Sequence, residues 1–449
     1  MIEERVWLGS YPEGVSADID ASQYPSLVGL MADSFAKYAN RTAYSFMGQD
    51  ISYAQTDVKS QALAAYFQSL DLEKGERVAI MMPNVPQYPV AVAAILRAGL
   101  VVVNVNPLYT PRELEFQLKD SGAKAIVIIE NFAITLQKCI AETQIKHVVL
   151  CAMGDMLSMP KGALVNFVVR NVKSLVPDFE LPGAIKFNQA LGLGERVTFV
   201  KPVVTSDDIA VLQYTGGTTG VSKGAVLLHR NVIANLLQSE AWNEPVMKRV
   251  PANEQPTSVC ALPLYHIFAF TVNMMLGMRT GGKNILIPNP RDLPAVLKTL
   301  STQTFHSFPA VNTLFNGLAN HPDFDTVNWK KLQEIPLYQK FGKQKSIVSE
   351  QCSTCCYYRL CAGCCQKNRF GCGDKSSELS ILCAGWKLFY EHTLVRFKEL
   401  AQLIIRERNP YKYNLPLFDL TNPNTQSKNS LCHCGSGNKF KKCCGAHCI

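Results

Sequence analysis

Tyr214-Thr-Gly-Gly-Thr-Thr-Gly-Val-Ser-Lys-Gly224 is the stretch that decides the fold, and it closely follows the apolar run Ile209 to Leu212. It contains four glycines, three threonines and one lysine. Glycines let backbone N–H groups approach an anion, hydroxyls add donors, and a lysine supplies a mobile positive charge. The composition therefore predicts a loop that grips a polyphosphate. A simple surface turn would need only one or two such residues.

The order Ser222-Lys223-Gly224 does not fit the Walker pattern, in which a glycine and a lysine precede the serine or threonine. The loop is therefore predicted to be a nucleotide loop of another kind.

Short β-rich runs alternate with helical patterns over the first 335 residues, which predicts an α/β fold with layered parallel sheets. Expected strands are 78–82, 100–105, 125–129, 147–150, 209–212, 259–262 and 285–287, and expected helices are 88–98 and 111–119. Open parallel sheets bind ligands beyond the carboxyl ends of their strands. The 214–224 loop follows such an end, so its predicted position agrees with its chemistry.

The 214–224 loop resembles the signature of the adenylate-forming enzymes, Tyr/Phe-Thr-Ser/Gly-Gly-Ser/Thr-Thr-Gly-x-x-Lys-Gly. Segments 6–14, 101–114 and 262–268 are similar to those of bacterial long-chain fatty-acyl-CoA ligases, and the likeness runs from about residue 3 to 333. The resemblance implies activation of a long-chain fatty acid by ATP and magnesium to an acyl-adenylate. Thioester formation with coenzyme A would follow.

The same resemblance implies roles for individual residues. Lys223 would contact the β- and γ-phosphates, and the cradle would be formed by Thr215, Gly216, Gly217, Thr218, Thr219 and Gly220. His266 would line the site of the acyl carboxylate, although a lone histidine beside apolar residues more often fills a packing role. His229 and Asn231 are expected to begin the next helix.

Two segments that the family carries after residue 333 are absent from this sequence: Gly-Tyr-Gly-Leu-Thr-Glu, which serves adenine and magnesium, and Tyr-x-x-Thr-Gly-Asp, which serves ribose. The mobile C-terminal domain with its catalytic lysine is also missing. Each lost contact that stabilises a transition state costs orders of magnitude in rate. We therefore expect a phosphate-binding loop with little or no ligase turnover.

The chain changes character near residue 335, because only three of its 16 cysteines precede residue 336. We expect a truncated AMP-binding domain over 1–335, a cysteine-rich domain over 336–408, a linker over 409–429 and a zinc motif over 430–449. A gene fusion, a frameshift and an assembly error would each produce such a composite.

Cysteines at short spacing in the tail indicate a metal framework, formed by Cys352, Cys355, Cys361, Cys365 and Cys383. Sulfur ligands alone do not choose between zinc and an iron-sulfur cluster. The spacing resembles the auxiliary-cluster (SPASM) domain of radical-SAM sulfatase-maturating enzymes. That resemblance implies a 4Fe-4S cluster on four of these cysteines, with Cys365 ligating a second cluster. The radical-SAM motif itself is absent.

The extreme C-terminus resembles the SEC-C type zinc motif found at the end of bacterial secretion ATPases. Two cysteines one residue apart, a glycine turn and two adjacent cysteines can surround one zinc ion. The zinc ligands would be Cys432, Cys434, Cys443 and Cys444. A protein partner could dock on this motif.

The net charge of +9 is spread along the chain, so nucleic-acid binding has no clear support. The first residues are acidic and form no apolar h-region, so no secretory signal is visible and we expect a cytoplasmic protein. Residues 162–171 mix apolar and basic side chains, so contact with the inner membrane face and packing in the core both remain open. Three function classes follow: an acyl-CoA ligase, a sulfatase-maturation fragment, and a non-catalytic metal-binding module.

Overall fold

The computed structural model describes residues 5–11, 13–215, 222–333, 347–361, 380 and 382–407. The chain divides into two compact units, Met1–Leu332 and Gln333–Ile449. The expected boundary at residue 335 lies three residues from this division.

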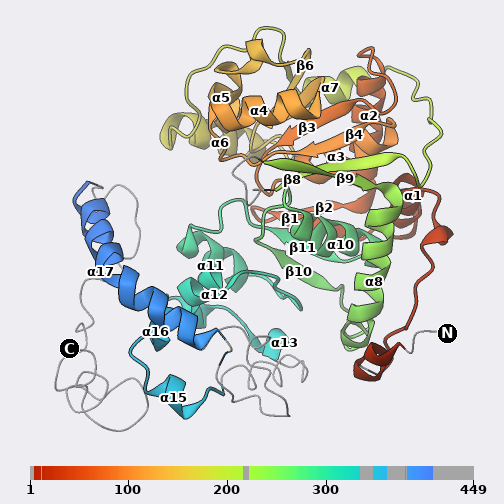
Figure 1. The fold of residues 1–449 in the computed structure, drawn as a ribbon. Coiled ribbons are helices and arrows are strands. Elements are labelled where there is room, and N and C mark those ends of the chain that lie inside the picture. The colour runs from red at the N-terminus through yellow and green to blue at the C-terminus, as the bar shows by residue number, and fades with distance from the viewer. Residues whose placement is uncertain are drawn as a thin grey trace. The chain divides into compact units, whose positions relative to one another are not determined.

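The larger sheet of the first unit has the strand order β7-β6-β5-β3-β4-β8-β9 (Figure 1). Its strands are β3 (Arg77–Met81), β4 (Val101–Asn104), β5 (Ala125–Ile129), β6 (His147–Cys151), β7 (Ile185–Lys186), β8 (Ile209–Thr215) and β9 (Lys223–Leu228). All neighbours are parallel except β9, which runs antiparallel to β8. The parallel α/β class expected from the sequence is confirmed.

The smaller sheet has the order β10-β11-β1-β2. Its strands are β1 (Thr42–Phe46), β2 (Gln49–Ser52), β10 (Thr257–Cys260) and β11 (Lys283–Leu286). Strand β11 runs parallel to both β10 and β1, while β2 runs antiparallel to β1.

Helices surround both sheets. The α-helices of the first unit are α1 (Leu27–Lys37), α2 (Tyr53–Gln68), α3 (Gln87–Arg97), α4 (Pro111–Ser121), α5 (Ala133–Gln137), α6 (Lys161–Phe167), α7 (Phe187–Gly194), α8 (His229–Met247), α9 (Ile267–Ala269), α10 (Leu276–Thr280), α11 (Leu293–Ser301), α12 (Asn312–Ala319) and α13 (Lys330–Gln333). The short helical turns are η1 (Val6–Ser10), η2 (Ala21–Gln23), η3 (Glu130–Phe132), η4 (Ile140–Glu142), η5 (Val168–Val172), η6 (Phe270–Met275) and η7 (Phe324–Thr326).

Alternation along β3 shows how the larger sheet is buried on both faces. Val78 and Ile80 belong to the core that includes α3, whereas Ala79 and Met81 belong to the core that includes α4 and α5. Successive side chains of a strand point to opposite faces, so a strand covered on both sides is apolar throughout. The continuous apolar runs in the sequence reflect this double burial.

Local sequence sets the ends of α4. Thr110 and Glu113 form a capping box, Pro111 occupies the first turn, and Gly122 ends the helix at φ +61°. The left-handed conformation is one that glycine adopts without a steric penalty. The start predicted at residue 111 is confirmed.

The described part of the second unit contains α15 (Glu350–Ser353), α16 (Tyr358–Cys361) and α17 (Cys383–Glu407). Tyr390 of α17 lies 5.6 Å from the ring of Tyr357 and 5.9 Å from that of Trp386, measured between centroids. Among the helices described in either unit, none combines the length and the apolar character needed to cross a bilayer.

Candidate functional site

The 214–224 loop is held at its two ends by the β8–β9 hairpin. Thr215 at the end of β8 pairs in register with Lys223 at the start of β9, and both side chains are exposed. The Ser222 hydroxyl donates to the Thr215 carbonyl oxygen at 3.0 Å. Within the described residues the Lys223 ammonium forms no ion pair. The Thr215 hydroxyl and the Lys223 ammonium therefore flank the loop at the carboxyl end of β8.

The remaining predicted cradle residues lie outside the described residues, namely Gly216, Gly217, Thr218, Thr219 and Gly220. Their contacts with phosphate stay predictions.

The base of the loop is packed around Tyr214. Its hydroxyl donates to Asp120 Oδ2 at 2.6 Å, and a Cβ atom built on Gly224 would lie 2.9 Å from the tyrosine Cζ. A side chain at position 224 would therefore collide with the ring. Burial, and then the Asp120 carboxylate, raise the pKa of Tyr214, so the phenol stays protonated and remains a donor.

A buried chain of amides connects this hairpin to the next segment of the site. The Tyr88 hydroxyl donates to Asn104 Oδ1 at 2.6 Å, and Asn104 Nδ2 donates to Gln213 Oε1 at 3.1 Å. Gln213 Nε2 in turn donates to the Tyr265 carbonyl oxygen at 3.2 Å. These hydrogen bonds fix β8 relative to Tyr265, the residue that precedes His266.

Sequence reasoning missed Asn104 and Gln213. Both are polar residues near the carboxyl ends of apolar strands, and that position was the available signal.

Asn84 also holds the segment between β10 and α9, through hydrogen bonds to its backbone. It is 3% exposed, and its Nδ2 donates to the carbonyl oxygens of Cys260 at 2.9 Å and Leu262 at 2.8 Å. Its Oδ1 accepts from the Leu264 N–H at 2.8 Å. One buried amide thus satisfies three backbone groups, and the sequence analysis did not identify it.

His266 is exposed and caps α9, where its Nδ1 accepts from the Phe268 N–H at 3.3 Å. In the neutral ring this contact places the proton on Nε2. An exposed N–H donor suits an acceptor such as a carboxylate. His266 is therefore not the buried core histidine of the alternative interpretation.

His229 and Asn231 begin α8, as expected. His229 is 2% exposed, and its Nδ1 accepts from the Leu27 N–H at 3.1 Å. Asn231 Oδ1 accepts from the Leu228 N–H at 2.9 Å. Burial lowers the pKa of His229 to about 4, so near neutral pH the ring is uncharged and can accept the hydrogen bond from the Leu27 N–H.

A family model described as AMP-binding enzyme matches residues 31–396. The chain belongs to this family. Long-chain-fatty-acid–CoA ligases of Escherichia coli O157:H7 and Haemophilus influenzae are 52% and 47% identical to it over 330 and 331 residues. These alignments cover 73% and 74% of this chain but 58% of each relative. The family member described here thus spans less than two thirds of the length of these relatives.

Solved structures share the fold at low identity. An anthranilate CoA ligase bound to anthranoyl-AMP has a TM-score of 0.58 and 19% identity, covering 70% of this chain and 55% of its own. A Rhodopseudomonas palustris protein described as a long-chain-fatty-acid CoA ligase has a TM-score of 0.53 and 16% identity, covering 68% and 67%. The adenylate-forming fold neighbours agree with the sheet architecture.

Four cysteines of the second unit line one cavity of about 20 Å³, together with aromatic residues of α16 and α17: Cys352, Cys355, Cys361 and Cys383. Burial raises the pKa of Cys383; the charge of Lys387 opposes this shift, and the other three thiols add to it. In the described ranges, no three His, Cys, Asp or Glu side chains are placed as ligands of one metal ion. The donor type fits a soft metal, but the arrangement is not yet that of a metal site.

The remaining predicted ligands, Cys365, Cys432, Cys434, Cys443 and Cys444, lie outside the described residues. A SEC-C motif model matches residues 429–446, so the motif expected at the C-terminus is present. Metal ligation by these cysteines stays a prediction.

Proposed function

We propose that the first unit binds ATP and a long-chain fatty acid and forms an acyl-adenylate slowly. The observation that carries the proposal is the pairing of Thr215 with Lys223 at the carboxyl end of β8. The pair presents a hydroxyl on one side of the glycine-rich loop and, on the other, a lysine that forms no ion pair with any described residue. The ligase relatives support a long-chain fatty acid as the substrate class.

In this proposal Lys223 binds the terminal phosphates, and Thr215 donates to an adjacent phosphate oxygen. The cradle is completed by Gly216, Gly217, Thr218, Thr219 and Gly220. His266 uses its exposed Nε2–H to orient the acyl carboxylate. Magnesium would offset phosphate charge when bound, and coenzyme A would be the acyl acceptor of the second half-reaction.

Slow turnover is part of the proposal, because the family's adenine, ribose and magnesium segments do not occur after residue 333. The test is release of pyrophosphate from ATP by the 449-residue protein, with and without a long-chain fatty acid. We expect weak, fatty-acid-dependent release that Lys223→Ala abolishes. Lys298→Ala, which removes an exposed lysine on α11, is the matched control and should leave release unchanged.

Release that is independent of fatty acid, or equal in Lys223→Ala, would overturn the proposal. If pyrophosphate release does not depend on fatty acid but the protein still binds ATP, the first unit would be a nucleotide-binding domain that does not form an acyl-adenylate.

A second function is favoured by the cavity that the four thiols line. We propose that Cys352, Cys355, Cys361 and Cys383 bind a soft metal after a small rearrangement, with zinc and a 4Fe-4S cluster as the two candidates. Cys365 would ligate a second cluster, and the SEC-C cysteines would bind zinc.

Elemental analysis of anaerobically purified protein tests this function. Iron together with a sulfide-to-iron charge-transfer absorbance band would favour the hypothesis of a sulfatase-maturation fragment. Zinc without iron would favour a metal-binding interaction module. Metal content that is the same in a Cys352→Ser/Cys383→Ser variant would exclude the cavity as the site.

The cellular setting belongs to the same proposal. We place the protein in the cytoplasm, with a peripheral contact to the inner membrane face and with the SEC-C motif available to a protein partner.

A further inference from the structure

Exposed apolar side chains lie on, and directly beside, the helical segment formed by α6 and η5. Five large apolar side chains between residues 159 and 175 are more than half exposed: Met159 (78%), Leu164 (62%), Phe167 (56%), Val172 (66%) and Leu175 (52%). Single exposed apolar residues are ordinary, but a contiguous group of them marks an interaction surface.

The opposite face of the same segment packs against the protein. Gly162 and Val169 are buried, and Val165 packs against the main core. A Cβ atom on Gly162 would lie 2.5 Å from the Gly154 carbonyl oxygen, so the helix can seat only because this position lacks a side chain. The segment is thus apolar on two faces, and only one of them is covered within the described residues.

Spacing keeps the exposed side chains together. Phe167 follows Leu164 by three residues, and Val172 follows Phe167 across a π-helical turn in which the Lys173 N–H donates to the Val168 carbonyl oxygen at 2.8 Å. Such π-turns occur frequently at functional sites. The turn brings Val172 back toward the side on which Phe167 lies.

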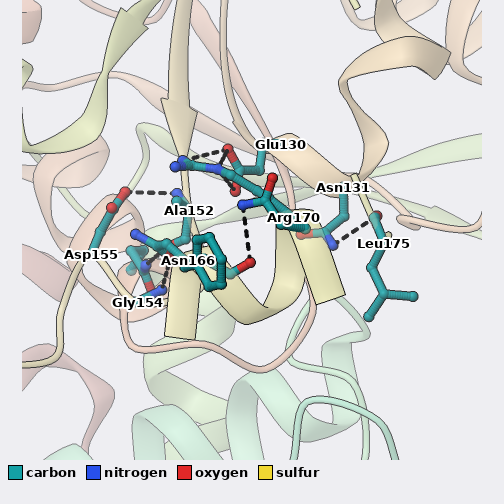
Figure 2. A network of polar contacts seen from close by, with 11 residues as sticks. Glu130, Asn131, Ala152, Gly154, Asp155, Asn166, Arg170 and Leu175 are labelled. Carbon is teal, nitrogen blue, oxygen red and sulfur yellow. Dashed lines mark hydrogen bonds and ion pairs between the residues drawn. The ribbon is translucent and has the colours of Figure 1, made fainter. Parts of the chain in front are cut away.

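A polar network fixes this segment to the ends of β5 and β6 (Figure 2). Arg170 forms a two-pronged ion pair with the buried Glu130, with Nε–Oε1 at 2.9 Å and Nη2–Oε2 at 2.8 Å. Asn131 Nδ2 donates to the Leu175 carbonyl oxygen at 3.1 Å, and Asn166 Oδ1 accepts from the Gly154 N–H at 2.6 Å. These contacts hold the exposed face in place, so a partner need not order it.

Charge indicates which partner the face fits. No Asp or Glu occurs from residue 156 to 177, while Lys161, Arg170 and Lys173 do. Glu130 neutralises Arg170, and Lys161 donates to the Met47 carbonyl oxygen. Lys173 is exposed and makes no ion pair among the described residues. The exposed Asp178 and Glu180 follow the segment, but within it apolar side chains lie beside net positive charge, which matches a membrane surface with anionic headgroups.

We propose that the α6–η5 face is a preformed docking surface for anionic phospholipid. It inserts the side chains of Leu164, Phe167 and Val172 at the headgroup boundary and uses Lys173 to select negative charge. This inference rests on the membrane contact proposed above and deepens it by naming the residues and the lipid class.

Co-sedimentation of the full chain tests it, using vesicles of phosphatidylcholine alone and vesicles that also contain phosphatidylglycerol. We expect binding to the anionic vesicles and an approximately tenfold lower partition coefficient for Leu164→Ser/Phe167→Ser. Lys173→Glu should weaken binding to anionic vesicles several-fold. Val58→Ser, at a similarly exposed valine on α2 (60% exposed), is the matched control and should bind like the wild type.

Four outcomes would overturn the inference. Equal binding of the double variant, or no vesicle binding at all, would remove the surface. Equal binding to neutral and anionic vesicles would keep the membrane contact but refute selection of anionic lipid. Concentration-dependent self-association that the double variant loses, seen by sedimentation velocity without vesicle binding, would assign the face to a second copy of the chain.

Discussion

At the base of the loop, Gly224 has no side chain, and this leaves room for the ring of Tyr214. Its substitution by alanine would place a methyl group 2.9 Å from Tyr214 Cζ, so either the strand or the ring, which donates to Asp120, would have to shift. We expect Gly224→Ala to lower the free energy of unfolding by about 1–3 kcal/mol. Urea denaturation measures this change.

Gly192→Ala is the matched control, because nothing lies within 4 Å of a Cβ atom at this position in α7. Alanine in a helix interior should stabilise it by about 0.5–1 kcal/mol. A neutral Gly224→Ala variant would show that the ring has room to move.

His229 predicts how stability depends on pH. Burial lowers its pKa from 6.5 to about 4, so between these values the unfolded chain binds a proton that the folded protein does not. The free energy of unfolding therefore falls as the pH drops through this window, by about 3 kcal/mol in total. Above pH 6.5 the full contribution is present.

Urea denaturation between pH 7 and pH 4 checks this prediction, with His229→Asn as the comparison. Asparagine retains an acceptor for the Leu27 N–H but does not titrate. The variant should lose less stability than the wild type across the window, and parallel pH profiles would refute the assigned pKa.

At the scale of elements, the segment between β10 and α9 depends on Asn84. Asn84→Ala would remove this partner from the Leu262 carbonyl oxygen and the Leu264 N–H, while the Cys260 carbonyl oxygen would still accept from the Ile287 N–H. We expect a loss of about 2–4 kcal/mol, since buried unsatisfied groups cost about 1–3 kcal/mol each and neighbours relax in part. Thermal unfolding measures the loss. Asn84→Asp retains the acceptor for Leu264 and should not restore stability, because it lacks the Nδ2 donor.

Strands and helices were largely predictable from the sequence. The limits expected for the 125–129 strand match β5. The strand expected at 147–150 ends one residue before β6 does, and the strand expected at 78–82 is shifted by one residue at both ends relative to β3. Apolar runs and capping residues are local signals, so they can be recognised in the sequence without knowledge of the fold. The position of the 214–224 loop after an apolar strand followed from the same signals, and β8 ends at Thr215.

The side chains that support the loop were not predictable in this way. Gln213 and Asn104 are 109 residues apart, and Tyr214 and Asp120 are 94 residues apart. They meet because β8 lies next to β4 in the sheet, and no local pattern specifies that neighbour. A polar residue at the end of an apolar strand shows that a partner is needed, but not which one.

At the scale of the whole molecule, two units carry two different chemistries. The first presents a hydroxyl and a lysine beside a glycine-rich loop, and the second gathers four thiols around one cavity. The AMP-binding family match runs to residue 396 and the SEC-C match from 429 to 446. The proposed nucleotide binding and the proposed metal binding can be tested separately in the full chain, with variants of Lys223 and variants of the four cysteines.

The central claim is that the β8–β9 hairpin holds the phosphates of ATP through Lys223. Isothermal titration calorimetry of ATP into the 449-residue protein tests it most directly, with Lys223→Ala and Lys298→Ala measured alongside. We predict binding by the wild type and by Lys298→Ala, with at least about tenfold weaker binding by Lys223→Ala, which corresponds to about 1.4 kcal/mol. Equal ATP affinity in all three proteins would contradict the account.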